Sequence, residues 1–179
     1  VMMNITYDNM MRNVQADENL YFADQVGLDK SAYRIFNYRL GSFASFRDNQ
    51  NAIQMRGIMF RTDDEPELVC LPMEKFFNVN ENEWTQNLDL TRAQHTFFKE
   101  DGSLISTWIG SDGEMHVKSK GSLHSDQVKG AYKVLNLFDD LRSRLYAWTI
   151  LGYTVDMEYV GPDNQIVLAY PWSTLRVLG

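Results

Sequence analysis

The sequence has 179 residues, which is enough for one domain with its own core and too few for two ordinary domains. Hydrophobic residues make up 44% of it and charged residues 23%, a balance that excludes disordered, collagen-like and low-complexity chains. The net charge of -7 argues against a protein that holds duplex DNA by neutralising phosphates over a broad surface, but it leaves room for a local basic pocket.

The sequence shows neither a membrane segment nor an export signal. No run approaches the roughly 20 apolar residues that span a bilayer, and the first residues lack a basic region followed by an apolar one. Cys70 is the only cysteine, so an internal disulfide cannot form, which fits a reducing compartment. We therefore expect a cytoplasmic protein that has no membrane partner.

The first part of the chain predicts one helix and two strands. Residues 4–22 mix apolar residues with acids and amides, which predicts a short amphipathic helix followed by a loop. Residues 33–38 and 58–60 are rich in aromatic and β-branched side chains, which is typical of strands. The acidic cluster at residues 63–67 predicts an exposed turn that leads into the apolar run at residues 68–71.

The middle of the chain predicts a short strand over residues 96–98 and a hairpin after it. Residues 104–109 and 114–120 form the two strands of this hairpin, because residues 110–113 have the composition of a turn. Side chains alternate between the two faces of a strand, so His116, Lys118 and Lys120 share one face. That face either meets solvent or lines an anionic site.

Two helices follow the hairpin. Ser125 is a candidate N-cap for the first helix, and Asp139 for the second, with Gly152 beyond its end. Apolar residues recur at helical spacing in both segments, and we expect them to face a core. The residues expected to face inward are Val128, Ala131, Tyr132 and Leu135 in the first helix and Leu141, Leu145 and Trp148 in the second.

The last part of the chain predicts three strands, over residues 153–160, 166–170 and 174–179. Alternation in the first of these places Asp156 and Glu158 on the same face. Hairpins with a helix pair between them predict an α+β domain with mostly antiparallel sheets and the helix pair packed on the sheet.

Lys99 is the first candidate for chemistry, because it ends a predicted strand and precedes a tight turn at residues 100–102. A lysine buried beside other cations, such as Lys118 and Lys120, has a pKa below its usual value of about 10.4 and becomes a nucleophile. The pattern K-x-D-G is short, however, and equally suits an exposed turn with a solvated lysine. By itself the motif leaves both interpretations open.

Other common catalytic patterns are missing. His95, His116 and His124 do not have metal-ligand spacing, and a single cysteine cannot make a structural zinc site. The sequence has no G-x-S-x-G elbow, no P-loop and no G-x-G-x-x-G fingerprint. Any phosphate must therefore be bound by lysine and arginine side chains.

Segments in order along the chain resemble the T-even phage RNA ligases of the tRNA-repair type. They are YRIFNY (33–38), MRGIMF (55–60), PMEKFFN (72–78), KEDGS (99–103), KSKGS (118–122), MEYV (157–160) and IVLAY (166–170). Residues 99–103 look like the nucleotidyl-acceptor motif of that family. The resemblance covers residues 33–170, and its strength lies in the order and separation of the segments.

The resemblance implies a covalent nucleotidyltransferase with an antiparallel, ATP-grasp-like ligase fold. In this family the motif lysine attacks the α-phosphate of ATP, the AMP passes to an RNA 5′-phosphate, and a 3′-hydroxyl then displaces it to seal the strand. The implied cofactors are ATP and Mg²⁺, and the implied partner is RNA with such ends, for example cleaved tRNA. We expect a monomer that acts in the cytoplasm, that of the host if a phage encodes it.

The resemblance also assigns residues. It makes Lys99 the nucleophile and Glu158 the acidic residue of the nucleotide site, where a carboxylate can accept ribose hydroxyls or hold a hydrated Mg²⁺. His116 and Asp156 match no role and are interpreted as structural. The positions that match nucleotide binding are Tyr38, Arg56, Lys75, Glu100, Asp101, Gly102, Lys118 and Lys120.

The family also carries, further along its chain, an E-G-[apolar]-V segment, a K-x-K strand and a helical C-terminal domain. These 179 residues contain none of them. We therefore expect residues 1–179 to form a single adenylyltransferase domain that is incomplete at its C-terminal end. Two alternatives stay open: another K-x-D-G enzyme, such as a DNA ligase or a capping guanylyltransferase, and a non-catalytic nucleotide- or RNA-binding module derived from a ligase.

Overall fold

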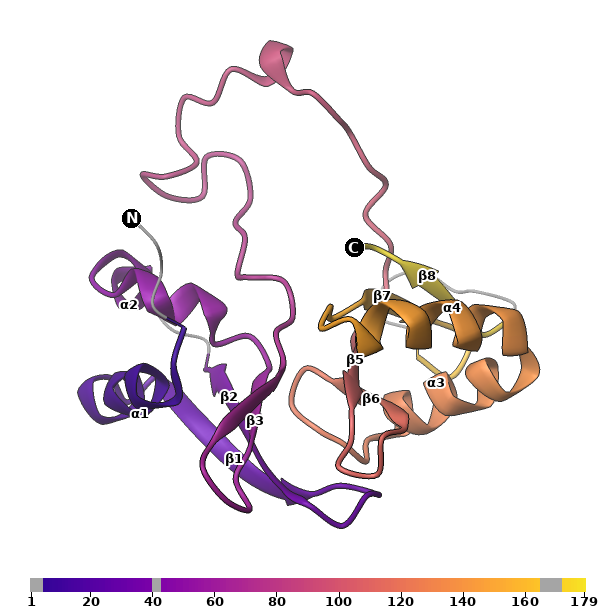
Figure 1. Ribbon diagram of the computed structural model, residues 1–179. Coiled ribbons are helices and arrows are strands. Elements are labelled where there is room, and N and C mark those ends of the chain that lie inside the picture. Colours follow the sequence, from indigo (N-terminus) through magenta and orange to yellow (C-terminus); the bar gives the residue numbers. More distant parts are fainter. Residues whose placement is uncertain (1–4, 40–42, 165–171) are drawn as a thin grey trace.

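The computed structural model describes residues 5–39, 43–164 and 172–179, and in it the chain folds into two lobes that lie side by side (Figure 1). Each lobe is built on a four-stranded antiparallel sheet, with the order β1-β2-β3-β4 in the first and β6-β5-β7-β8 in the second. Together with the helices of both lobes, this confirms the α+β class and the antiparallel sheets predicted from the sequence.

The first lobe begins with helix α1 (Tyr7–Ala16), which Thr6 caps by accepting a hydrogen bond from the Asn9 N–H at 3.2 Å. Strand β1 (Leu20–Val26) follows, and it contradicts the loop predicted after the helix. β1 pairs along its whole length with β2 (Ala32–Tyr38). Residues 20–26 form a strand because they pair with β2 and are partly buried by it, and the local sequence pattern does not predict this pairing.

The other elements of the first lobe are short: α2 (Ala44–Arg47), the 3-10 helix η1 (Gln50–Gln54), β3 (Ile58–Arg61) and β4 (Glu67–Cys70). Strands β2 and β3 confirm the predictions for residues 33–38 and 58–60. The acidic cluster forms an exposed turn between β3 and β4, as predicted.

Residues 71–102, all of them described, run from the first lobe to the second in a long arc (Figure 1) whose one regular element is the 3-10 turn η2 (Leu90–Arg92). The strand predicted over residues 96–98 is therefore wrong. Phe97 and Phe98 are 89% and 96% exposed, so their side chains find no sheet face against which to pack.

The second lobe consists of β5 (Ser103–Ile109), β6 (Met115–Ser119), α3 (Asp126–Leu137), α4 (Asp139–Ile150), β7 (Asp156–Val160) and β8 (Thr174–Val177). These elements confirm the predicted hairpin, the helix pair and the final strand. The strand predicted over residues 166–170 lies outside the described residues. None of the helices within the described ranges is long and apolar enough to cross a membrane.

The two helices of the second lobe begin in different ways. Ser125 caps α3 as predicted, and its hydroxyl accepts a hydrogen bond from the Val128 N–H at 3.3 Å. Asp139 does not cap α4, because Phe138 occupies the N-cap position and Asp139 is already the first helical residue. Its negative charge in the first turn still suits the positive end of the helix dipole.

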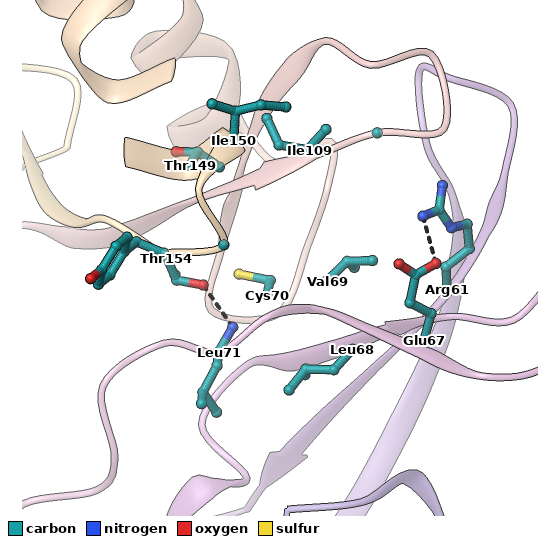
Figure 2. A pocket seen from close by; sticks show the side chains of 13 residues that line it. Arg61, Glu67, Leu68, Val69, Cys70, Leu71, Ile109, Thr149, Ile150 and Thr154 are labelled. Atoms are coloured by element: carbon teal, nitrogen blue, oxygen red, sulfur yellow. Dashed lines mark hydrogen bonds and ion pairs between the residues drawn. The ribbon is translucent and has the colours of Figure 1, made fainter. Parts of the chain in front are cut away.

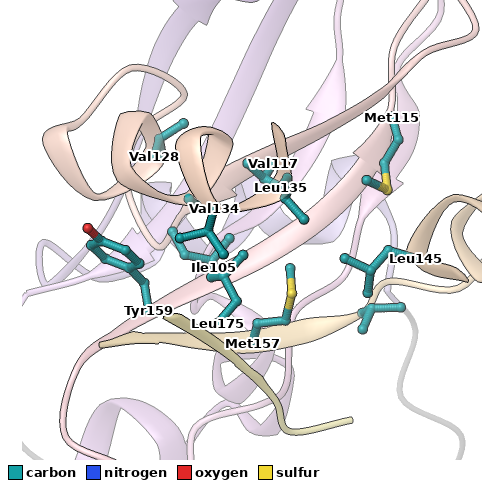
Figure 3. Close-up of a cluster of buried hydrophobic side chains, with 12 residues drawn as sticks. Ile105, Met115, Val117, Val128, Val134, Leu135, Leu145, Met157, Tyr159 and Leu175 are labelled. Atoms are coloured by element: carbon teal, nitrogen blue, oxygen red, sulfur yellow. The ribbon is translucent and has the colours of Figure 1, made fainter. Parts of the chain in front are cut away.

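A buried apolar core joins α3 and α4 to the second sheet (Figure 3). Leu145 and Thr149 form the buried face of α4, so Trp148, which the sequence predicted to face inward, lies beside that face and is 56% exposed. The buried residues of this core are Ile105, Met115, Val117, Val128, Ala131, Val134, Leu135, Leu145, Val155, Met157, Tyr159 and Leu175. The core holds β5 and β7 in place, and side chains that alternate with the core residues, such as Glu158, lie on the opposite face of the sheet.

A second apolar cluster lies at the seam, by which we mean the contact between the two lobes. Tyr33, Ile35 and Met59 of the first sheet pack there against Trp108 and Leu123 of the second lobe. The rings of Tyr33 and Trp108 meet edge to face with centroids 4.7 Å apart. The lobes therefore share a core, and residues from both lobes hold fixed positions at the seam.

The polar face of β6 is buried in this seam. Met115 and Val117 point into the core beneath the helices, so alternation turns His116 and Lys118 toward the first sheet, where they are 7% and 0% exposed. His116 stacks on Trp108 with ring centroids 4.7 Å apart. The predicted shared face of β6 is confirmed for these two residues, and it faces protein instead of bulk solvent.

Candidate functional site

Two lysines, one from the second lobe and one from the segment that follows β4, lie near the ring of Tyr38, the last residue of β2. The Nζ of Lys120, which follows β6, lies 4.2 Å from the ring centroid, and the Nζ of Lys75, which follows β4, lies 5.6 Å from it. Lys75 Nζ also lies 5.0 Å from the ring centroid of Phe77. Aromatic faces attract ammonium groups without neutralising them, so the seam presents two positive charges that suit an anionic ligand.

Arg56 adds a third cation to the seam. It follows η1 and is half-buried, and its Cζ lies 5.3 Å from the ring centroid of Phe76. Its Nη1 is buried and has no hydrogen-bond partner among the described residues. A buried donor without an acceptor is costly, so an oxygen atom from a ligand would stabilise this arrangement.

Lys118 supports the turn that carries Arg56. Gly57 has φ +96°, and a Cβ at this position would lie 2.8 Å from the Lys120 carbonyl oxygen, so the turn requires glycine. Lys118 Nζ donates a hydrogen bond to the Gly57 carbonyl oxygen at 2.7 Å, and burial lowers the pKa of Lys118 below its ordinary value. Lys118 therefore supports the backbone next to Arg56, and a direct contact between Lys118 and phosphate stays a prediction.

Glu158 on β7 is the carboxylate at which several predicted residues converge. Burial raises the pKa of Glu158 above its ordinary value. A hydrogen bond from the Gly102 N–H and the positive charges of Lys99 and Arg56 act in the opposite direction on the same pKa. The K-x-D-G turn therefore lies against the half-buried carboxylate of Glu158 on β7, and the positive charge of Arg56 from the first lobe acts on the same group.

The packing of Gly102 on β7 explains the glycine of the K-x-D-G motif. A Cβ on residue 102 would overlap the carbonyl oxygen of Tyr159 and lie 2.9 Å from Val160 Cγ1. The turn therefore lies directly on the backbone of β7, which only a residue without a side chain permits. Lys99 is exposed and is presented by this turn.

The two acidic residues of the motif lie beside the same strand. Glu100 forms an ion pair with Arg176 of β8 at 3.3 Å, and Arg176 is the residue opposite Glu158 in the β7–β8 pairing. The negative charge of Asp101 raises the pKa of Glu158. The structure brings both residues to Glu158, while their part in nucleotide binding stays a prediction.

We expect Glu158→Gln to stabilise the fold near neutral pH. Because the folded-state pKa of Glu158 lies above its unfolded value, its contribution to stability is present below the unfolded pKa and is lost as pH rises through the folded pKa. Glutamine removes this loss. Urea unfolding at about pH 4 and about pH 7 should show a stability gain for the variant only at the higher pH. Glu65→Gln, in the exposed acidic turn, is the control and should show no gain; an equal gain there would contradict the expectation.

Asp156, which the sequence interprets as structural, is buried and accepts hydrogen bonds from Ser106 and Met73, as that interpretation expects. Two other residues near these groups, Arg176 and Phe76, are not predicted from the sequence, because their positions depend on strand pairing and on the path of the chain after β4. For these two residues the local sequence carried no signal.

The described residues offer no preformed metal cage, since no three His, Cys, Asp or Glu side chains in this part of the chain could hold an ion together. The charges of Lys99 and Arg56 beside Glu158 also oppose a resident divalent cation. These residues therefore do not fit a resident Mg²⁺. Mg²⁺ in proteins often keeps several waters and binds through one or two carboxylates plus substrate phosphates, and its arrival with a phosphate ligand stays a prediction.

A separate pocket of about 350 Å³ lies between β4 and the end of α4 (Figure 2), and its lining includes none of the predicted site residues. The Leu71 N–H donates a hydrogen bond to Thr154 Oγ1 at 2.9 Å at this pocket, and Arg61 pairs with Glu67 at 2.8 Å. Cys70 is buried there, and burial raises the pKa of its thiol to about 11. The thiol is therefore protonated at neutral pH and does not act as a nucleophile.

Comparison with known protein families agrees with the resemblance read from the sequence. A family model described as RNA ligase matches residues 54–179, which is more than two thirds of the chain. The matched region contains the K-x-D-G motif, Glu158 and every other predicted site residue except Tyr38. The chain belongs to the T4 RNA ligase 1 family of RNA ligases.

Proposed function

We propose that the protein is an ATP-dependent RNA ligase that joins RNA 5′-phosphate and 3′-hydroxyl ends, such as those of cleaved tRNA, through a lysyl-AMP intermediate on Lys99. Family membership supports ATP and RNA as the substrate classes. The observation that carries the proposal is the packing of the K-x-D-G turn on β7, where the Gly102 N–H donates to Glu158 and the charges of Lys99 and Arg56 act on that carboxylate. The ligase-type nucleotidyltransferase fold of the two lobes is part of the same proposal.

In the first step the amine nitrogen of Lys99 attacks the α-phosphorus of ATP. A nitrogen–phosphorus bond forms, the bond to pyrophosphate breaks, and the amine releases a proton. Such a displacement depends mainly on positioning and on stabilising the charge that develops on phosphate oxygens. The unpartnered Nη1 of Arg56 supplies a donor, and the ammonium groups of Lys75 and Lys120 supply positive charge at the same seam.

In the next two steps an oxygen of the RNA 5′-phosphate attacks the AMP phosphorus, which releases Lys99, and the 3′-hydroxyl then attacks the RNA phosphate, which releases AMP. The half-buried Glu158 is suited to accept hydrogen bonds from the ribose hydroxyls of AMP. Its position beside the motif turn would hold the AMP while it passes to the RNA 5′-phosphate and while the 3′-hydroxyl then displaces it.

Labelled nucleotides test this function. The chain is incubated with Mg²⁺ and ATP or GTP that carries the label in the α-phosphate, denatured, and examined for covalent label. We expect label from ATP, and its discharge onto RNA with a 5′-phosphate but not onto RNA with a 5′-hydroxyl. Tight ATP binding without any covalent label would instead favour a non-catalytic module. Label from GTP would favour a capping enzyme, and discharge onto DNA ends in preference to RNA would favour a DNA ligase.

A further inference from the structure

Asp156 is a buried carboxylate at the start of β7, two residues before Glu158, and it is only 5% exposed. Its Oδ1 accepts a hydrogen bond from Ser106 Oγ at 2.5 Å, within the second sheet. Its Oδ2 accepts one from the backbone N–H of Met73 at 2.7 Å, across the seam. One carboxylate therefore links the strand of Glu158 to the segment after β4.

That segment, residues 71–75, pairs with no strand and is held by alternate backbone N–H groups. Leu71 donates to Thr154 Oγ1 at 2.9 Å and Met73 to Asp156 Oδ2 at 2.7 Å, both on the second lobe. Lys75 donates to the Ile53 carbonyl oxygen at 2.7 Å, on the first lobe. Of the bonds to the second lobe, the one made by Asp156 lies nearer in sequence to Lys75.

The surroundings of Asp156 explain why an ionisable group is tolerated there. Burial raises its pKa, while the Ser106 and Met73 hydrogen bonds and the charges of Lys118 and Arg56 act in the opposite direction. Lys118 in turn supports the Gly57 turn next to Arg56. The carboxylate thus hydrogen-bonds to the segment that carries Lys75, belongs to the strand that carries Glu158, and is stabilised by the positive charge of Arg56.

We propose that Asp156 is a positioning residue, whose carboxylate fixes the segment that carries Lys75 against the strand that carries Glu158. The consequence for function rests on the proposed nucleotide site, because it assumes that Lys75 and Glu158 bind parts of the same ATP molecule. Without the Met73 bond, the ammonium group of Lys75 would have a wider range of positions relative to Glu158, and ATP would bind more weakly. An asparagine at this position can still accept from Met73 and donate to Ser106, so it should preserve the link.

The test compares three variants, Asp156→Ala, Asp156→Asn and Ser106→Ala, in the whole chain. Amide hydrogen exchange of residues 71–75 reports the link directly, and calorimetric titration with ATP reports the site. We expect about tenfold faster exchange and about tenfold weaker ATP binding in Asp156→Ala, and changes within about twofold in Asp156→Asn. Ser106→Ala removes the other hydrogen bond of the same carboxylate and should leave both readouts near those of the wild type.

The outcomes separate a positioning role from a merely structural one. A general loss of packing would affect Ser106→Ala as well as Asp156→Ala, and an equal loss of ATP binding in both would overturn the proposal. An unchanged ATP dissociation constant in folded Asp156→Ala would also overturn it. If the wild-type chain binds ATP but never forms an adduct, the proposed ligase chemistry fails, while the exchange and binding data still decide the role of Asp156.

Discussion

Lys99→Arg is expected to abolish adenylation of the protein, with a loss of at least about a thousandfold. Arginine keeps the positive charge and most of the length of the side chain, but its guanidinium does not lose a proton in proteins and cannot supply the attacking nitrogen. Lys99 is exposed, so the free energy of unfolding should change by no more than about 0.5 kcal/mol. Intact-mass measurement after incubation with ATP and Mg²⁺ gives the adduct, and urea unfolding gives the stability.

Lys129→Arg is the matched control for this variant, because Lys129 is an exposed lysine on α3 whose side chain is 69% accessible. It should form the adduct at the wild-type rate. Non-covalent ATP binding should persist in Lys99→Arg, since the other cations of the site are intact. Adduct formation by Lys99→Arg at more than a small fraction of the wild-type rate would remove Lys99 as the nucleophile.

Gly102→Ala is expected to lower the rate of adenylation by about a hundredfold or more. The new methyl group would overlap the Tyr159 carbonyl oxygen, which belongs to the β7 backbone and is fixed by the sheet. The motif turn would have to move off β7, so the hydrogen bond from the residue 102 N–H to Glu158 and the placement of Lys99 would both be lost. The initial rate of label transfer from ATP measures the effect.

Gly121→Ala is a strict control, because Gly121 follows the site residue Lys120 but has room for a methyl group. The nearest atom to a Cβ there is Asn37 Nδ2, at an ordinary contact distance of 3.8 Å. We expect its adenylation rate to stay within about threefold of wild type. Equal effects of the two substitutions would show that close packing of Gly102 on β7 is not what the chemistry requires.

Local sequence patterns predicted the elements that have a clear capping residue or a composition typical of one kind of structure. The helix capped by Ser125 and the strand at residues 33–38, which is rich in aromatic and β-branched side chains, are both confirmed. Strand β1 (Leu20–Val26) was missed because its structure depends on pairing with β2. The strand predicted over residues 96–98 failed for the opposite reason, since strand-like side chains there have no partner to pack against in the described structure.

In the candidate site, too, the sequence predicts residue types and local turns, but not the contacts between residues that are far apart in the chain. The K-x-D-G motif predicts that Lys99 precedes a tight turn, but the packing of that turn against Glu158 depends on the tertiary structure. Alternation in β6 predicted that His116 and Lys118 share a face, yet it could not say that the first sheet would cover this face. The bond from Met73 to Asp156 joins residues far apart in sequence, so no local pattern predicts it.

The location of the covalent adenylate tests the central claim most directly. The wild-type chain is incubated with ATP and Mg²⁺, digested, and its peptides are sequenced by tandem mass spectrometry. We expect a single adenylated residue, Lys99, in the peptide that contains the K-x-D-G motif. An adenylate on Lys75 or Lys120, or ATP bound tightly with no adenylated peptide at all, would contradict the assignment of Lys99 as the nucleophile of this RNA ligase family member.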